Sequence, residues 1–219
     1  MSLDIGEPPI MAQLFPLFAT NIVVEQIANH DKFKKIIVPK LTESFKLNST
    51  EKEPWANNCH TCQKSGFKND LEIIYKNLHL AIDGYFKFIG CGKFNYVIDA
   101  WYNIHTSDMY QENHNHIGQG VLLSGIYYIQ YNPEIDQPVV FTANGSSSRF
   151  CDLLRYNGLK ANFVGETTAE QPNFLNIKEG DLLLFPPTAN HYVPRALVPH
   201  NNLRITLAFN VQFVSIKNN

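Results

Sequence analysis

The spacing of apolar residues changes near the middle of the chain. In two earlier segments, residues 25–46 and 69–90, apolar residues recur every three to four positions, which predicts amphipathic helices. The stripe of the second segment consists of Leu71, Ile74, Leu78, Ile82 and Phe86. Asn69 is placed to cap the start of this helix and Gly90 to end it. Residues 47–67 lack the pattern and are expected to form a loop.

From about residue 96, apolar and polar residues alternate, which predicts β-strands. We expect strands within residues 96–104, 120–131, 137–143, 180–187 and 201–216. Helices followed by many short strands are typical of a barrel or sandwich with helices packed on one sheet. The pattern therefore predicts one mainly β domain over residues 1–219, with a helical layer over about 1–95 and a β core over about 96–214.

The last predicted strand has two different faces. One face is apolar and is expected to pack against the helices: Leu203, Ile205, Leu207, Phe209 and Val211. The other face carries a guanidinium, a hydroxyl and two amides: Arg204, Thr206, Ala208, Asn210 and Gln212. This polar face either lines a binding site inside the β core or faces solvent, and the pattern alone leaves both open.

Composition and charge exclude several classes of partner. The 219 residues are 44% hydrophobic and 17% charged, as in an ordinary globular domain, and the net charge is −2. Without a basic excess, nucleic acid and anionic membranes are poor partners. No apolar run approaches the roughly 18–20 residues of a membrane helix. The N-terminus does not read as a secretion signal, so we expect a cytoplasmic protein.

The four cysteines do not form a recognisable metal or disulfide pattern. Cys59 and Cys62 form one C-x-x-C pair, and Cys91 and Cys151 do not supply a second pair. Ordinary thiols are favoured over a zinc or redox site. Scattered thiols also suit a reducing compartment such as the cytoplasm.

Three histidines have the spacing of a metal site. His114 and His116 are two residues apart just before a predicted strand, so on an extended chain both side chains point to the same side. This arrangement suits two neighbouring ligands of one metal. His191 follows a later buried strand and a Pro-Pro break, and Arg204 and Thr206 come after it.

These residues together resemble the Fe(II)/2-oxoglutarate-dependent oxygenases. In that pattern an H-x-(D/E) motif precedes a distant histidine and an Arg-x-Ser/Thr motif. The strings "HNH…LSGIYYI", "GDLLLFP…NHYV" and "RITLAFN" are similar to a group of such oxygenases from phage and marine bacteria. They are more distantly similar to prolyl hydroxylases. The resemblance covers about residues 97–213.

The resemblance implies a double-stranded β-helix, or jelly-roll, that holds Fe(II) and uses 2-oxoglutarate as co-substrate in a hydroxylation. His114 and His191 match the first and the distal metal ligand. Arg204 matches the cation that binds the far carboxylate of 2-oxoglutarate, with Thr206 beside it. Tyr128 matches a tyrosine that assists co-substrate binding.

His116 departs from the pattern, since it stands where the larger superfamily has Asp or Glu. The three-histidine set of His114, His116 and His191 is the favoured interpretation. Asp108 is an alternative source of a carboxylate, and a halogenase-like H-x-G motif over residues 116–118 is another. The alternative functions are a cupin-like three-histidine dioxygenase without 2-oxoglutarate and a non-catalytic metal-binding module.

Several features remain less specific. The prime substrate, a small molecule or a peptide, is not encoded in the metal motif. The long polar insert at residues 141–174 is expected to contact the substrate. Asn103 and Gln111 are candidates to line the site, and exposed strand edges are compatible with a homodimer. The remaining histidines are not expected to bind the metal: His30, His60, His79, His105 and His200.

Overall fold

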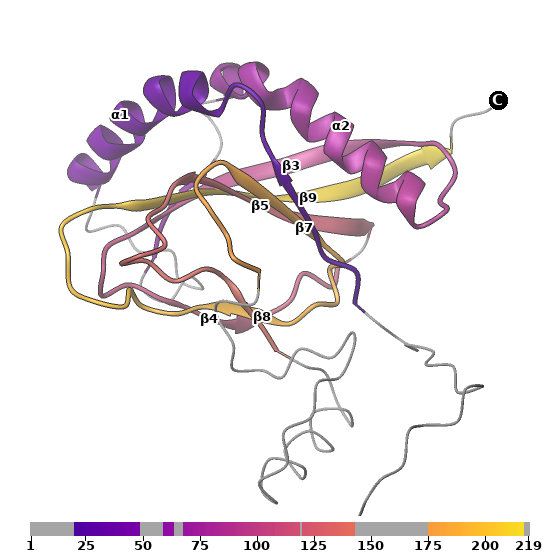
Figure 1. The fold of residues 1–219 in the computed structure, drawn as a ribbon. Helices are drawn as coiled ribbons and strands as arrows, with labels where there is room; N and C mark the ends of the chain where they lie inside the picture. Colours follow the sequence, from indigo (N-terminus) through magenta and orange to yellow (C-terminus); the bar gives the residue numbers. More distant parts are fainter. Residues whose placement is uncertain (1–19, 49–58, 64–67, 119, 143–174, 217–219) are drawn as a thin grey trace, which may run out of the picture.

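The computed structural model describes residues 20–48, 59–63, 68–118, 120–142 and 175–216 (Figure 1). These residues form two antiparallel sheets and two α-helices, stacked as helices, large sheet and small sheet. The mainly β, jelly-roll fold class predicted from the sequence is confirmed.

The large sheet has six strands, and each strand is antiparallel to its neighbours. In spatial order they are β1 (Val23–Gln26), β7 (Asp181–Phe185), β5 (Val121–Gln130), β9 (Arg204–Ile216), β3 (Phe94–His105) and β2 (His60–Gln63). The small sheet consists of β4 (Gln111–His114), β8 (His191–Val193) and β6 (Val140–Phe141). β9 and β3 lie side by side over twelve paired positions, and this long pairing aligns the residues of the site described below.

The helices cover one face of the large sheet, and the small sheet lies on the other side (Figure 1). They are α1 (His30–Asn48) and α2 (Glu72–Phe88), the second preceded by the 3₁₀ turn η1 (Lys68–Leu71). One hydrophobic core joins the helices to the large sheet and includes Phe33, Ile37, Leu78, Ile82 and Phe209. A second, smaller core includes Tyr128, Leu183, Phe185 and Val193 and joins the two sheets.

The two faces of β9 point into these two layers. Ile205, Leu207, Phe209 and Val211 are buried in the helix-side core, as the alternation predicts. The polar face therefore points toward the small sheet, and three of its residues, Arg204, Thr206 and Ala208, are also buried. The sequence left open whether the polar face lines the β core or faces solvent, and in the structure it lines the β core.

The N-terminal half differs from its sequence-based description in three places. Residues 23–26 form strand β1 at the edge of the large sheet, so α1 begins at His30 instead of residue 25. Residues 60–63, expected in a loop, form β2 and pair with β3. Asn69 does not cap α2, because η1 occupies residues 68–71 and no side chain caps the helix. Gly90, with φ of 76°, follows α2 as expected.

Gly125 lies under an aromatic ring where no side chain fits. It pairs with Phe209 across β5 and β9, and a methyl group at this position would overlap three ring carbons of Phe209. We expect Gly125→Ala to lower the free energy of unfolding by about 1–3 kcal/mol through overpacking. Gly84→Ala is the control, because nothing lies within 4 Å of the added methyl on α2. Denaturant unfolding measures both, and equal stabilities of the two variants would contradict the steric account.

Candidate metal centre

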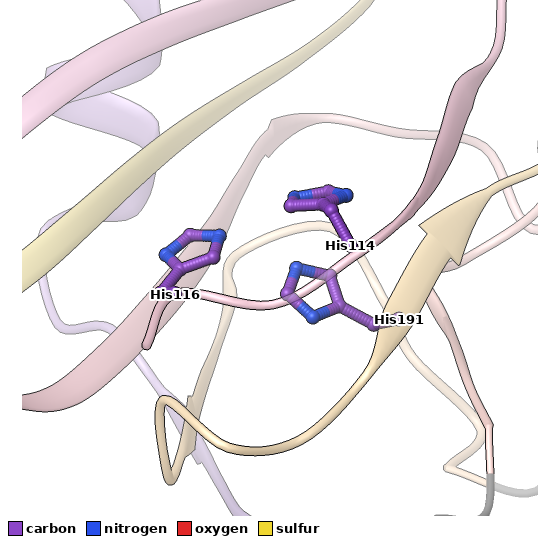
Figure 2. Close-up of side chains that lie close together, drawn as sticks. All are labelled: His114, His116 and His191. Carbon is purple, nitrogen blue, oxygen red and sulfur yellow. The ribbon is translucent and has the colours of Figure 1, made fainter. Parts of the chain in front are cut away.

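Three histidines converge on one point: one on β4, one just after it and one on β8 (Figure 2). His114 ends β4, His191 begins β8, and the two are direct partners in the antiparallel pairing. His116 follows two residues after His114, and its backbone N–H donates to the carbonyl of Pro187 at 2.9 Å. One ring nitrogen of each histidine lies within 4.8 Å of the others. The structure thus brings together the three histidines that the sequence singled out.

The side chains around His114 and His116 alternate in direction, as the extended backbone predicts. His114 and His116 are half-buried, whereas the residues between and beside them are exposed. Asn115 is exposed, and its side-chain amide donates to the side-chain oxygen of Asn190 at 2.8 Å. The extended backbone therefore presents both imidazoles to the same side.

Backbone carbonyls fix the orientation of two of the rings. Nδ1 of His114 donates to the carbonyl of Glu112 at 2.7 Å, and Nδ1 of His191 donates to the carbonyl of Ala189 at 2.9 Å. Because a carbonyl only accepts, Nδ1 carries the proton in both rings. Nε2 of each ring is then the unprotonated nitrogen with a lone pair available to a metal.

Asn210 orients the third ring in the same way. Its side-chain oxygen accepts hydrogen bonds from His116 Nδ1 at 2.7 Å and from Ser124 Oγ at 2.9 Å. Asn210 belongs to the inner face of β9, and Ser124 lies opposite it on β5. The sequence marked Asn210 only as part of a polar face, and the link to His116 became visible only in the folded structure.

The surroundings of His116 and His191 favour the neutral form of these two imidazoles. Burial, together with the neighbouring His114 and His116, lowers the pKa of His191 to about 3. Burial also lowers the pKa of His116, although its bond to Asn210 acts in the opposite direction. Since only neutral imidazole binds a metal, these rings stay available to a metal well below the ordinary pKa of histidine.

Among the described residues, no carboxylate joins the three histidines. Asp108, the alternative ligand considered from the sequence, is exposed and accepts a short hydrogen bond from the hydroxyl of Thr106. The donor set in the structure is therefore three nitrogens. Such a set suits a transition metal of intermediate softness.

Arg204 lies with Asn210 and Thr206 on the polar face of β9, which points toward the small sheet and is called the inner face. It is 4% exposed, and no ion pair to it is found in the part of the chain that the structure describes. Its guanidinium carbon lies 5.6 Å from the centre of the Tyr128 ring, whose hydroxyl accepts from the Val139 N–H at 3.0 Å. A buried cation without a carboxylate partner is costly, which suits a site that receives an anion.

The neighbouring strand β3 adds a second row of side chains on the same side of the large sheet. Trp101, Asn103 and His105 lie opposite Ala208, Thr206 and Arg204, respectively. The Trp101 ring lies 6.0 Å from that of His116, and its buried Nε1 has no hydrogen-bond partner among the described residues. Asn103, a predicted lining residue, accepts from Thr61 at 3.3 Å. Trp101 was not singled out by the sequence.

Other sequence features lie apart from this cluster. His30 contacts Tyr127, and His200 pairs with Asp136 at 3.2 Å. Cys59 is buried, and its sulfur lies 3.7 Å from the hydroxyl oxygen of Thr61, while the side chain of Cys62 lies outside the described residues. Most of the insert expected to contact substrate, residues 143–174, also lies outside them. None of the described helices is long and apolar enough to cross a membrane.

Comparison with known families identifies one match. A family described as "Putative 2OG-Fe(II) oxygenase" matches residues 99–210, just over half of the chain. The matched segment contains β4, β8 and β9 as far as Asn210, and it includes all three histidines and Arg204. Comparison with curated protein sequences gives no match.

Solved structures with a similar fold include several oxygenases. A prolyl-4-hydroxylase from Pseudomonas putida has a TM-score of 0.53 and 11% identity, covering 89% of this chain and 94% of its own. A viral collagen prolyl hydroxylase from Paramecium Bursaria Chlorella virus-1 gives 0.53 and 11%, with 87% and 96% covered. HygX from Streptomyces hygroscopicus, with nickel, 2-oxoglutarate and hygromycin B bound, gives 0.51 and 13%, with 89% and 83% covered. At these identities the similarity concerns the fold.

Proposed function

Because the chain belongs to the 2OG-Fe(II) oxygenase family, we propose that His114, His116 and His191 bind its Fe(II) and that Arg204 anchors its 2-oxoglutarate. The protein is a 2-oxoglutarate-dependent dioxygenase, and Fe(II) and 2-oxoglutarate are its cofactor and co-substrate. The observation that carries the residue assignment is the convergence of three imidazole nitrogens within 4.8 Å.

The donor chemistry fits ferrous iron. Imidazole is a ligand that iron accepts, and each ring is held by a hydrogen bond at Nδ1, as is usual for metal-binding histidines. Three protein ligands would leave further positions of the metal to the co-substrate and dioxygen. Three neutral histidines also leave the site more positive by about one charge than a site with a carboxylate. This favours a dianionic co-substrate.

Arg204 is suited to the distal carboxylate of 2-oxoglutarate. Its planar fork makes two charge-assisted hydrogen bonds to a carboxylate, and its burial keeps competing water away. Thr206, on the same face of β9 and 3% exposed, adds a hydroxyl donor next to the arginine. Tyr128 supports the guanidinium with its ring face and assists co-substrate binding from β5.

When bound, Fe(II) supplies the coupling of 2-oxoglutarate decarboxylation to oxidation of the substrate by dioxygen. The protein's part is to position and shield the reactants. Phe141 and Phe185 flank His191, with ring centres 5.8 and 4.9 Å away, and exclude water from that side of the site. The reaction we propose is a hydroxylation.

The prime substrate that we propose is a small molecule or a peptide. The similar structures include prolyl hydroxylases and HygX with hygromycin B bound, which represent both classes. The exposed free thiol of Cys91 agrees with a cytoplasmic location. That residues 1–219 form a single domain, and that the protein forms a homodimer, are predictions from the sequence.

The experiment that tests the function measures succinate formed from 2-oxoglutarate in air. We expect formation that requires added Fe(II) and stops with a chelator. Oxygen uptake that needs Fe(II) but not 2-oxoglutarate would favour the three-histidine dioxygenase without the co-substrate. Metal binding without either reaction, across a panel of substrates, would favour the non-catalytic module.

Asn210 offers a test of the orienting hydrogen bond. Asn210→Leu removes the acceptor of His116 Nδ1, and Fe(II) affinity is expected to fall about 10- to 100-fold, as for other lost partners of metal-binding histidines. The control is Asn95→Leu, which removes an exposed side-chain amide on β3 that is hydrogen-bonded to Ser215 on β9. Equilibrium dialysis with metal analysis measures both. Equal affinities in the two variants would remove Asn210 from the site.

A further inference from the structure

His105 and Arg204 face each other in the interior of the protein. They are direct partners in the antiparallel pairing of β3 with β9, so their side chains lie on the same face of the large sheet. The neighbours Ile104 and Ile205 point to the opposite face, into the core beneath the helices. His105 is 3% exposed and Arg204 is 4% exposed.

Both side chains carry buried nitrogens that have no hydrogen-bond partner among the described residues. Neither ring nitrogen of His105, nor Nε of Arg204, has a partner within the residues that the structure describes. Buried polar groups in proteins nearly always have such a partner, because leaving them unpaired is costly. The imidazole of His105 and the Nε–H of Arg204 lie on the same face of the sheet and lack an acceptor in the described part of the chain, which is an arrangement that an anionic ligand would complete.

The location of the pair relative to the histidines gives the ligand an orientation. Along β9 the inner face runs from Asn210, which bonds His116, to Arg204. Along β3 it runs from Trp101, whose ring lies 6.0 Å from that of His116, to His105. His105 and Arg204 therefore occupy the end of the row that is remote from the three histidines.

We propose that His105 is a second anchor for the distal carboxylate of 2-oxoglutarate, donating a ring N–H to one carboxylate oxygen beside Arg204. This rests on the function proposed above for Arg204. His105 was expected from sequence not to bind the metal, and it lies outside the metal cluster, but its position opposite Arg204 gives it a role toward the co-substrate.

A neutral imidazole is compatible with this role. Burial and the neighbouring Arg204 charge lower the pKa of His105 well below its usual range, so the ring does not add a second positive charge beside the guanidinium. A neutral ring still carries one N–H donor. The other side chains near Arg204, the hydroxyls of Thr206 and Tyr128, complete a polar set around the carboxylate.

The test compares two ligands on the His105→Phe variant. 2-Oxoglutarate and 2-oxopentanoate share the chelating end, but 2-oxopentanoate has a methyl group in place of the distal carboxylate. Binding of each to the Fe(II) protein is followed anaerobically by the visible absorption of the complex. We expect His105→Phe to weaken 2-oxoglutarate about ten- to hundredfold, which is the effect of one hydrogen bond to a charged group. The affinity for 2-oxopentanoate should stay unchanged.

Controls separate a lost contact from a disturbed fold. His105→Gln retains a donor and should recover part of the 2-oxoglutarate affinity, whereas His79→Phe on α2 should leave both affinities unchanged. Equal weakening of both ligands by His105→Phe, or no change for either, would overturn the anchor. Failure of the wild-type protein to bind 2-oxoglutarate at all would instead contradict the proposed function of the site.

A crystal structure of the wild-type protein with 2-oxoglutarate and a redox-inert metal gives a test that needs no variant. The inference expects a His105 ring nitrogen within about 3.2 Å of a distal carboxylate oxygen. A co-substrate bound at Arg204 with His105 out of hydrogen-bond reach would overturn it.

Discussion

Replacement of Arg204 by leucine is expected to weaken 2-oxoglutarate binding by about 2–5 kcal/mol, or roughly thirtyfold to several thousandfold in Kd, while Fe(II) stays bound. The reason is that the distal carboxylate would be buried beside an apolar side chain without its cation. Isothermal titration calorimetry on the anaerobic Fe(II) protein measures the change. Arg195→Leu, which removes an exposed arginine stacked on Tyr110, is the matched control.

The same variant has an unusual expected effect on stability. Arg204 is buried and forms no ion pair with any described residue, so leucine removes an uncompensated charge from the ligand-free protein. The free energy of unfolding without ligand should therefore stay the same or rise. A large loss of stability in Arg204→Leu, or an unchanged Kd for 2-oxoglutarate, would contradict the assignment of Arg204 as an anion anchor.

Replacement of His191 by alanine is expected to abolish Fe(II) binding at micromolar metal, and with it the formation of succinate. It removes one of three ligands, so the loss should exceed the about 10- to 100-fold effect of a lost hydrogen-bond partner. Metal content after equilibrium dialysis measures the effect. Stoichiometric iron retained in His191→Ala would place the metal elsewhere.

Packing must be separated from ligation in this experiment, because the His191 ring is 2% exposed and contacts Phe141 and Phe185. His191→Leu fills most of the same space without a ligand atom. Both variants should lose the metal, while only the alanine variant should lose several kcal/mol of stability through a cavity. Iron binding restored by leucine would indicate that the ring acts through packing alone.

The parts of this architecture that depend on local patterns could be predicted from the sequence. Alternation along residues 203–211 predicted the apolar face of β9 under the helices, and the H-x-H spacing predicted two imidazoles on one side. Gly90 was correctly placed at the end of α2 because a positive φ is a local requirement. Such features need only the neighbouring residues and the period of the element.

Features that depend on strand register could not be predicted. Asn210 and His116 are 94 positions apart, and their hydrogen bond exists only because the fold brings β9 of the large sheet next to the segment that follows β4. His105 faces Arg204 only in the observed pairing of β3 with β9, since a shift by one residue would turn one of them to the other face. Residues 25–26, the second half of the short strand β1, were read as the start of a helix because four residues carry too little periodicity to reveal a strand.

The central claim is that three histidines, without a carboxylate, hold Fe(II) in a form that chelates 2-oxoglutarate. The most direct measurement is an anaerobic titration of the Fe(II) protein with 2-oxoglutarate, followed by the visible charge-transfer band of the chelated complex. The account predicts a band in the wild-type protein and in Asp108→Ala, and none in His116→Ala. A band that survives in His116→Ala, disappears in Asp108→Ala, or fails to form on the wild-type Fe(II) protein would contradict it.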